Sequence, residues 1–513
     1  MSLSTELTAH STAELLRMYR RKETTPAAVL EACIARIEQL NPLVNAVTAT
    51  CFERAREEAT ASTKRYAEGA PNGALDGLPL GVKDLLDTKD LLSTYGAKHL
   101  RNNVPDQDSP WVAQLRQAGA IIVGKTNVPE MGAGGNTRNP VWGATGNPFD
   151  PALTAGGSSG GSAAALALDL LPLCTGSDTG GSLRLPAALC GVIGFRPTAN
   201  LVPNGARTLG WSNLSVMGPM ARNMEDLLLF LHNSLGQEPT DPLSFRAVSE
   251  EFSLATADLL KGLRIGYSED FGDLPVEPEV RETFRDRVAS LAEVAQSCEP
   301  VDLQLGEMDR CFDITRAEAF VAVFEGEMGV DEAGLAPTVA ANLELARNMT
   351  LRDKAWAHLE QTRLLRRYVS LMQDYDVILT PTTPVRPFSW QIGAAMEVEG
   401  QKQDTYYRWL ALTYRATLFN CPALTLPSGR TPAMPNEMSM PFGLQILGRP
   451  AADAVLLRVA SAIEDFWKND PLRCRPVPDA AGLTPSEPSL TSIVTHPPTA
   501  DSAKSTRAVL NVV

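Results

Sequence analysis

The stretch "GSDTGGSLRLP", residues 176–186, combines serines, glycines, an acid and an arginine within eleven positions. A second cluster, "GGSSGGSAAALA" at residues 156–167, again surrounds serine with glycine. Folded chains keep glycine mainly where the backbone takes an unusual conformation or approaches another group closely, because glycine loses more conformational entropy on folding than other residues. The two clusters therefore indicate a place where hydroxyl groups and bare backbone approach something closely.

The segments around these clusters alternate between helix and strand patterns. Residues 24–42 predict a helix that ends at Asn41-Pro42, and residues 75–88 predict a strand. Residues 111–126 have the pattern of a helix, a turn and a short buried strand, and residues 161–178 repeat the order of helix and strand. This alternation predicts an α/β fold with helices on the faces of a sheet.

The second half of the chain has a different pattern. Residues 237–370 are mainly helical in pattern, and the clearest helix covers 353–375. Strand patterns and a closing helix follow at 376–381, 421–429, 441–448 and 454–467. After residue 475 the chain is rich in Pro, Ser, Thr and Ala. We therefore predict one domain over residues 1–475 with a variable, substrate-shaping helical region at 237–370, and a poorly ordered tail at 476–513.

The composition is that of a soluble globular protein. The 513 residues are 44% hydrophobic, and a net charge of −14 disfavours a nucleic-acid-binding surface. The start lacks the pattern of a signal peptide, and no run approaches the ~18 apolar residues of a membrane span. The eight cysteines are scattered without a C-x-x-C pair, which predicts free thiols in a cytoplasmic protein.

Two motifs match literally but in the wrong context. "GAIIVGKT" (119–126) fits the phosphate-loop pattern, yet its Ile-Ile-Val centre has the pattern of a strand interior. "GGSSG" (156–160) fits the nucleophile motif of an α/β-hydrolase with Ser158 as nucleophile, but no strand pattern precedes it. That chemistry needs a histidine base, and the candidates lie in predicted helices or in the tail: His232, His358 and His496. The α/β-hydrolase interpretation remains an alternative.

No metal or cofactor is expected, because the chain has neither an H-E-x-x-H motif nor a cluster of histidines. Serine chemistry without histidine needs another base, and Lys83 is the candidate. A lysine with its usual pKa of about 10.4 is protonated at neutral pH, and it becomes a base only where burial penalises the cation. Lys83 follows Gly81 in an apolar strand pattern, which leaves room for other groups to cover it. The alternative is a lysine that reaches solvent beside Asp84.

In their order along the chain, these stretches closely resemble the amidase signature family. The resemblance spans most of residues 12–470, is poor in the middle helical region and does not include the tail. It is carried by the two glycine–serine blocks, with Ser158 and Ser182 24 positions apart, and by "GLPLGVKDLLDT", "GKTNVPEMGAGGNT", "WGATGNPFDP", "GPMARNMEDLL", "DVILTPTTP" and "FGLQILG". It implies a large mixed twisted central sheet flanked by helices on both faces, and hydrolysis of linear amides.

The resemblance also implies a Ser-Ser-Lys triad. Ser182 is then the nucleophile, Ser158 the bridging serine with a cis peptide bond before it, and Lys83 the base. The implied oxyanion hole consists of backbone N–H groups of Thr179, Gly180, Gly181 and Ser182.

Supporting roles are expected around this triad. A short helix is expected to begin at Ser182, and its dipole would favour negative charge at the oxyanion. We expect an ion pair between Asp178 and Arg184 to fix the loop. Ser159 and Ser177 are expected to make local hydrogen bonds only.

The family resemblance leaves the substrate open, because members cleave aliphatic, aromatic, fatty-acyl and carbamate-like bonds. One branch supplies ammonia to tRNA amidotransferases and reads glutamine partly through an acid about a dozen positions before the proline that matches Pro422. This chain has Leu410 there, lacks the Arg-Tyr-Asp-Gly run of that branch, and has Asn420 where many members have glycine. An A-type glutaminase subunit of a tRNA-dependent amidotransferase is therefore the alternative rather than the first prediction.

The residues near Leu410 favour an apolar or aromatic pocket. Either they line this pocket or they simply pack a helix: Tyr406, Tyr407, Trp409, Leu410 and Tyr414. The family lines its pocket floor at positions that here are Gly132, Gly134 and Gly135. We therefore predict an amidase that forms an acyl-enzyme on Ser182 with apolar or aromatic amides or anilides, with esters and carbamates as further candidates. The expected partner is a small-molecule amide, without nucleic acid or membrane, and a homodimer is the oligomer to test for.

Overall fold

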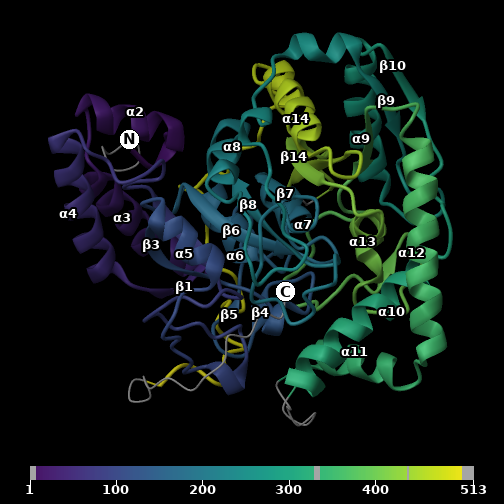
Figure 1. Cartoon of the computed structure of the whole chain (residues 1–513), viewed down its shortest axis with the longest axis horizontal. Helices are drawn as coiled ribbons and strands as arrows, with labels where there is room; N and C mark the ends of the chain where they lie inside the picture. The colour runs from purple at the N-terminus through teal and green to yellow at the C-terminus, as the bar shows by residue number, and fades with distance from the viewer. Residues whose placement is uncertain (1–6, 328–334, 436–437, 500–513) are drawn as a thin grey trace.

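The computed structural model describes residues 7–327, 335–435 and 438–499 (Figure 1). Within these residues the centre is a sheet of eleven strands in the order β1-β3-β2-β6-β8-β7-β14-β15-β11-β9-β10. Its strands are β1 (Val47–Thr50), β2 (Pro79–Lys83), β3 (Ile121–Thr126), β6 (Leu173–Asp178), β7 (Ile193–Arg196), β8 (Val216–Ala221), β9 (Arg264–Tyr267), β10 (Ser297–Pro300), β11 (Val377–Pro381), β14 (Ala423–Arg430) and β15 (Pro441–Leu447).

The sheet is mixed, as predicted. β3, β2 and β6 run parallel to one another, and so do β11, β9 and β10, whereas the other neighbouring pairs are antiparallel. Among the described residues, two further sheets have two short strands each: β4 (Arg138–Asn139) with β5 (Gly143–Ala144), and β12 (Glu397–Val398) with β13 (Gln401–Lys402). The predicted α/β fold class is confirmed.

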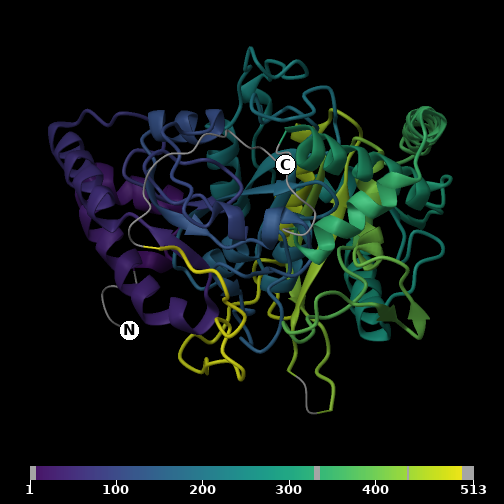
Figure 2. The same ribbon diagram turned by 90° about the horizontal axis from the view of Figure 1, so that it is seen from below.

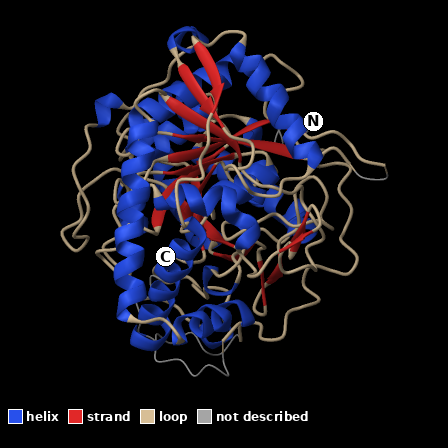
Figure 3. Cartoon of the chain, turned by 90° about the vertical axis from the view of Figure 1, so that its right-hand side faces the viewer, coloured by secondary structure: helices blue, strands red, loops and turns tan. Residues whose placement is uncertain are grey.

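Helices pack on both faces of the sheet (Figure 3). One core joins Ile121 and Val123 of β3 to α3 (Pro26–Val44), α6 (Gly160–Ala167) and α7 (Arg184–Cys190). The other core contains Ile122 together with α2 (Thr12–Arg21), α5 (Pro110–Gln117), α8 (Met224–His232) and α14 (Asp453–Trp467). Because successive strand residues point to opposite faces, neighbouring residues of β3 enter different cores. This also confirms that the Ile-Ile-Val centre of "GAIIVGKT" is strand interior.

The remaining α-helices pack against strands of the sheet or against one another. They are α4 (Phe52–Glu68), α9 (Pro278–Ala292), α10 (Met308–Phe320), α11 (Pro337–Arg347), α12 (Leu351–Leu371) and α13 (Ala411–Leu418). Residues 237–370 supply β9 and β10 as well as helices, so the prediction of a mainly helical region missed the last two strands of the sheet. Each has only four residues, and β10 is half exposed, so neither leaves a clear apolar alternation in the sequence.

The predicted end of the first long helix is wrong. Helix α3 passes through Pro42 and ends at Val44, where Asn45 takes a left-handed conformation with φ of 50°. A proline removes one helical hydrogen bond, to the carbonyl four residues earlier. Here that carbonyl belongs to Glu38, which is exposed, as is Pro42, so water can replace the missing donor.

The start of the predicted tail is packed against the domain. The Leu490 side chain is buried, and its carbonyl accepts a hydrogen bond of 2.8 Å from the Ala144 N–H. Trp390 Nε1 donates to Ser486 Oγ at 2.9 Å. Figure 2 shows this yellow segment crossing the lower side of the molecule. The prediction of poor order is therefore wrong for residues 476–499, because their buried side chains pack against the domain. Residues 500–513 lie outside the described part.

Candidate active site

Lys83 is the last residue of β2 and is completely buried between β3 and β6. Its Nζ lies 2.8 Å from Ser158 Oγ and 2.8 Å from Ser177 Oγ, within hydrogen-bonding distance of both. Burial lowers the pKa of the Lys83 amine well below its ordinary value of 10.5, and the negative charge of Asp178 opposes this only in part. The alternative of a lysine that reaches solvent is therefore wrong.

Asp84, the next residue, does not neutralise Lys83. Its carboxylate accepts hydrogen bonds from the Thr94 N–H at 3.0 Å and from Thr94 Oγ1 at 2.6 Å, and it faces Lys125 Nζ at 3.9 Å. Within the described part of the chain, no carboxylate lies within 4.0 Å of Lys83 Nζ. Without an ion pair to stabilise a cation, the buried amine is favoured in its neutral form.

Ser158 precedes α6, and the Gly157–Ser158 peptide bond is cis, as the resemblance implies. The glycines here allow backbone to meet backbone. A Cβ at Gly161 would lie 2.2 Å from the Asn127 nitrogen, so this position of the helix has room only for hydrogen. The tight contact places the start of α6, and with it Ser158, against the loop that follows β3.

Ser182 lies in the loop between β6 and α7, and its side chain is half buried. The helix begins at Arg184, two residues later than predicted, with Leu183 as its N-cap. The Ser159 N–H donates to the Ser182 carbonyl at 3.2 Å, which joins the two glycine–serine clusters. Ser158, Ser177 and Ser182 line one cavity, so the structure brings the three hydroxyl groups together beside Lys83.

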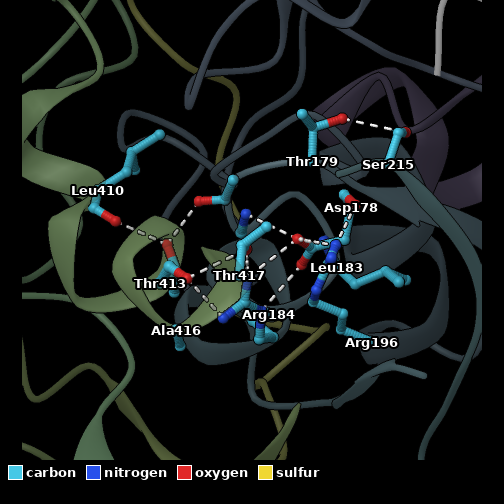
Figure 4. A network of polar contacts seen from close by, with 12 residues as sticks. Asp178, Thr179, Leu183, Arg184, Arg196, Ser215, Leu410, Thr413, Ala416 and Thr417 are labelled. Atoms are coloured by element: carbon cyan, nitrogen blue, oxygen red, sulfur yellow. Dashed lines mark hydrogen bonds and ion pairs between the residues drawn. The ribbon is translucent and has the colours of Figure 1, made fainter. Parts of the chain in front are cut away.

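The loop that carries Ser182 is built around Asp178 (Figure 4). Arg184 donates to both carboxylate oxygens of Asp178, at 3.0 and 2.9 Å, so the predicted ion pair is present. Arg196 lies 3.3 Å from the same carboxylate. Burial alone would raise the pKa of Asp178, but Arg184, Arg196 and backbone N–H groups together hold it well below its ordinary range. Arg184 also donates to the Thr413 carbonyl at 2.8 Å and so ties the loop to α13.

One of the four predicted oxyanion-hole donors is already occupied. The Gly181 N–H donates to Asp178 Oδ1 at 2.8 Å, so Gly181 does not fit that prediction. Among the described residues, the N–H groups of Thr179, Gly180 and Ser182 have no protein acceptor. Gly181 instead fixes the loop: its φ is 127°, and a Cβ there would lie 2.2 Å from Thr413 Oγ1.

The cavity beside Ser182 has mainly apolar walls. Together with its open mouth it holds about 740 Å³ of empty space. Its apolar walls come from Leu85, Met131, Leu209, Leu214, Phe320, Val323 and Phe324. A smaller neighbouring cavity also reaches Ser182, and its walls include Gly132, Gly134, Phe312, Tyr406, Tyr407, Leu410 and Tyr414. Ser182 therefore borders two cavities.

Two predicted pocket residues lie outside both cavities. Trp409 is 2% exposed and packs against Phe388, and its Nε1 donates to the Tyr406 carbonyl at 3.1 Å. A Cβ at Gly135 would lie 2.6 Å from Trp409 Cζ2, so these two residues contact each other and do not line either cavity. The prediction that Gly135 and Trp409 line the pocket is wrong because both are packed in the core.

Sequence reasoning underestimated Ser177 and missed Arg316. Ser177 lies in the first quoted stretch, and its closeness to Ser182 in the chain was the available signal. Arg316, in α10, lines both cavities, but it comes from the region where the resemblance is poor. The expectation of a local bond for Ser159 is wrong: its side chain does not cap α6, and its Oγ donates at 3.5 Å to the Ser177 carbonyl, 18 positions away.

We expect Asp178→Asn to destabilise the protein by about 3–5 kcal/mol, because it leaves Arg184 and Arg196 buried without a counter-ion. The measurement is urea unfolding at neutral pH. Asp258→Asn is the control, because Asp258 and its partner Lys261 are exposed, and it is expected to change little. Since the folded pKa of Asp178 is lowered, its contribution is complete above the ordinary value of 3.8 and is lost only as the pH falls through the lower folded value. Equal stability of the two variants would contradict this role of Asp178.

The mixed sheet carries a buried lysine beside two glycine–serine loops, and no histidine is among the described residues that line either cavity. Comparison with known proteins identifies the family. A family model described as Amidase matches residues 28–457. The chain belongs to the amidase family, and it is an amide C–N hydrolase.

Individual relatives share most of their length with this chain. It is 31% identical to an acylamidase of Rhodococcus erythropolis over 88% of this chain and 94% of the relative. It is 33% identical to the A-type subunit of the glutamyl-tRNA(Gln) amidotransferase of Moorella thermoacetica, over 89% and 96% respectively. The crystal structure of a bacterial aryl acylamidase of the amidase signature family superposes with a TM-score of 0.81 at 26% identity, covering 90% of this chain and 96% of that one.

Two further observations concern the described residues as a whole. None of their helices has the length and apolarity that a membrane span requires. No group of three or more His, Cys, Asp or Glu side chains is arranged among them to hold a metal ion.

Proposed function

We propose that this protein hydrolyses small carboxylic amides through an acyl-enzyme on Ser182, with Ser158 as proton relay and Lys83 as base. The observation that carries the proposal is the 2.8 Å contact between Lys83 Nζ and Ser158 Oγ in a fully buried setting. A buried neutral amine can accept a proton that an exposed ammonium cannot. Ser158 and Ser182 line the same cavity, and we expect the hydrogen bond between their hydroxyls to form when substrate binds, because catalytic hydrogen bonds often tighten only in the complex.

The first step forms the acyl-enzyme. Ser182 Oγ attacks the amide carbon while its proton passes to Ser158, and the proton of Ser158 passes to Lys83. The N–H groups of Thr179, Gly180 and Ser182 are the available donors for the oxyanion. When the C–N bond breaks, the proton returns from Lys83 through Ser158 to the departing nitrogen, which leaves as a neutral amine.

The second step consumes water. A water molecule attacks the acyl carbon and gives its proton to the same relay, and the carboxylic acid leaves as Ser182 recovers its proton. Ser177 holds the amine of Lys83 from a second side, at 2.8 Å, and so orients it toward Ser158. Asp178 and Arg184 act through the loop and not on the substrate.

The substrate we propose is an apolar or aromatic amide or anilide, with esters and carbamates as further candidates. The apolar walls of the larger cavity and the rings of Tyr406, Tyr407 and Tyr414 in the smaller one support this choice. The similarity to an acylamidase and to an aryl acylamidase supports it further. The eight cysteines are unpaired, which supports a reducing compartment such as the cytoplasm.

The second candidate is a glutaminase subunit of a tRNA-dependent amidotransferase, which several relatives are. Leu410 disfavours the glutaminase candidate, because this apolar side chain lines the cavity at the position where that branch has an acid. Asn420 carries no weight in this choice: its φ is 50°, and asparagine tolerates this left-handed conformation better than most residues. Membership of the amidase family excludes the α/β-hydrolase alternative.

We expect the purified chain, without partner or tRNA, to hydrolyse at least one anilide in a panel of 4-nitroanilides, aliphatic amides, esters and carbamates, and to leave glutamine intact. The measurement is release of nitroaniline or ammonia. Glutaminase activity that appears only with partner subunits and tRNA would favour the second candidate instead.

A further inference from the structure

The described walls of the two cavities at Ser182 carry positive charge without negative charge. Among the described residues that line them, Arg207 and Arg316 are charged, and none is an aspartate or glutamate. The other described lining residues are uncharged, either apolar or hydroxyl-bearing, and such walls screen a charge less than bulk water does, so the two arginines act strongly on whatever enters. The imbalance points to a ligand that carries the opposite charge.

Of the two arginines, Arg316 is the stronger evidence for an anionic ligand. It is 8% exposed, and its Nε and Nη2 donate to neutral acceptors, Asn342 Oδ1 at 2.9 Å and Tyr406 Oη at 2.7 Å. Its guanidinium also lies 4.8 Å from the Phe320 ring and 5.0 Å from the Tyr407 ring. In the described part of the chain no carboxylate pairs with Arg316, and its Nη1 has no hydrogen-bond acceptor. A buried cation held in place but left without a counter-ion is costly unless a ligand supplies one.

Arg207 adds a second positive charge to the larger cavity. It is 9% exposed, and its Nε and Nη2 have no hydrogen-bond partner among the described residues. The carboxylate of Asp241 lies 3.7 Å from Nη2, outside hydrogen-bonding distance, and it accepts hydrogen bonds from Asn200 and from the Asn204 N–H. Asp241 therefore offsets the charge of Arg207 only in part, and it does not reach Arg316.

We propose that the substrate is an amide that carries a carboxylate at the far end of an apolar arm, and that Arg316 binds this carboxylate while Ser182 attacks the amide. The proposal rests on the function proposed above, and it names the substrate class. Arginine suits this task because its charge is permanent and its N–H groups match the two oxygens of a carboxylate. Arg316 lines both cavities, so the charged arm can belong to the acyl group or to the amine.

The experiment uses two matched pairs of substrates. In the first the carboxylate is on the acyl arm: the mono-4-nitroanilide of adipic acid against heptanoic 4-nitroanilide. In the second it is on the amine: N-hexanoyl-4-aminobenzoate against N-hexanoyl-4-methylaniline. We expect at least a tenfold preference in kcat/KM for the charged member of one pair, and that pair identifies the arm.

The variants are Arg316→Met, which keeps a long apolar stem, and Arg316→Lys, which keeps the charge. Arg316→Met is expected to abolish the tenfold preference, and Arg316→Lys to keep part of it. An equal loss on the charged and neutral members, or a wild-type enzyme without preference in both pairs, would overturn the proposal while amide turnover still supports the function.

A binding measurement separates the two proposals when turnover fails. In Ser182→Ala, calorimetry with adipic monoamide and with hexanamide reports charge recognition without chemistry. We expect at least tenfold tighter binding of adipic monoamide, and loss of this difference when Arg316→Met is added. Equal binding of the two amides would refute the inference whatever the enzyme hydrolyses.

Discussion

Ser182→Ala is expected to abolish hydrolysis of every amide that the protein accepts, by about 10⁶-fold, the loss seen when a serine protease loses its nucleophile. The physical reason is that in the proposed mechanism Ser182 forms the covalent bond to the acyl group, so no other group of the relay can replace it. The measurement is turnover of the best anilide of the panel. Mass spectrometry of the quenched wild-type enzyme should also show the acyl group on Ser182.

Ser249→Ala is the control for this variant, because Ser249 is an exposed serine in η3 (Ser249–Glu251), and the same substitution there should leave turnover unchanged. Both variants are expected to unfold at the same denaturant concentration within error, because the half-buried hydroxyl of Ser182 has no hydrogen-bond partner among the described residues. Substantial turnover in Ser182→Ala, or an acyl group attached to Ser158, would refute the assignment of the nucleophile.

Lys83→Met is expected to lower kcat/KM by at least the factor of about 10² to 10⁴ that general-base catalysis supplies. Methionine has a similar length and no amine, so the cavity between β3 and β6 stays filled while the proton acceptor is lost. In the proposed mechanism the active form is the neutral amine. The rate therefore rises as the pH increases through the lowered pKa of Lys83 and reaches its plateau below the ordinary value of 10.5.

The pH profile distinguishes a base from a merely structural lysine. Lys83→Met should lose the rise in kcat/KM that wild type shows, since the group that titrates is gone. Lys125→Met is a matched control for a buried lysine: Lys125 is also fully buried, but it contacts Asp84 and Thr88, and it should affect stability rather than the shape of the profile. A profile in Lys83→Met that keeps the wild-type rise would rule out Lys83 as the base.

The sequence alone indicated the elements that place the site. The patterns at β2, β3 and β6 predicted strands, and the apolar run at 121–123 predicted that β3 is buried, because a strand covered on both faces needs apolar residues throughout. The glycine–serine blocks predicted close backbone contacts, and the contacts at Gly161 and Gly181 have that character. Lys83, Ser158 and Ser182 were predicted together from the resemblance, and the structure brings them to one cavity; their catalytic roles remain predictions until the variants are measured.

Local patterns failed where the decisive contact lies far away in the chain. Trp409 is an aromatic residue of the kind that lines apolar pockets. It lies outside the cavity because it packs against Gly135 and Phe388. The segment 476–499 has the composition of a disordered tail, yet Leu490 is buried against the domain. Composition predicts whether a segment can fold by itself. It does not show whether the rest of the chain provides an apolar surface against which the segment can pack.

The sequence by itself determined the family, the sheet-forming segments and the three residues of the proposed triad, because these are properties of residue types and their spacing. Only the tertiary structure decided that Lys83 is buried, that Asp178 occupies the Gly181 N–H, and that Arg316 faces the cavity without a counter-ion from the described residues. The physical reason is that charge state and hydrogen-bond availability depend on everything around a group. Lys83 and Ser158 are 75 positions apart and Arg184 and Thr413 are 229 apart, so no local pattern encodes those surroundings.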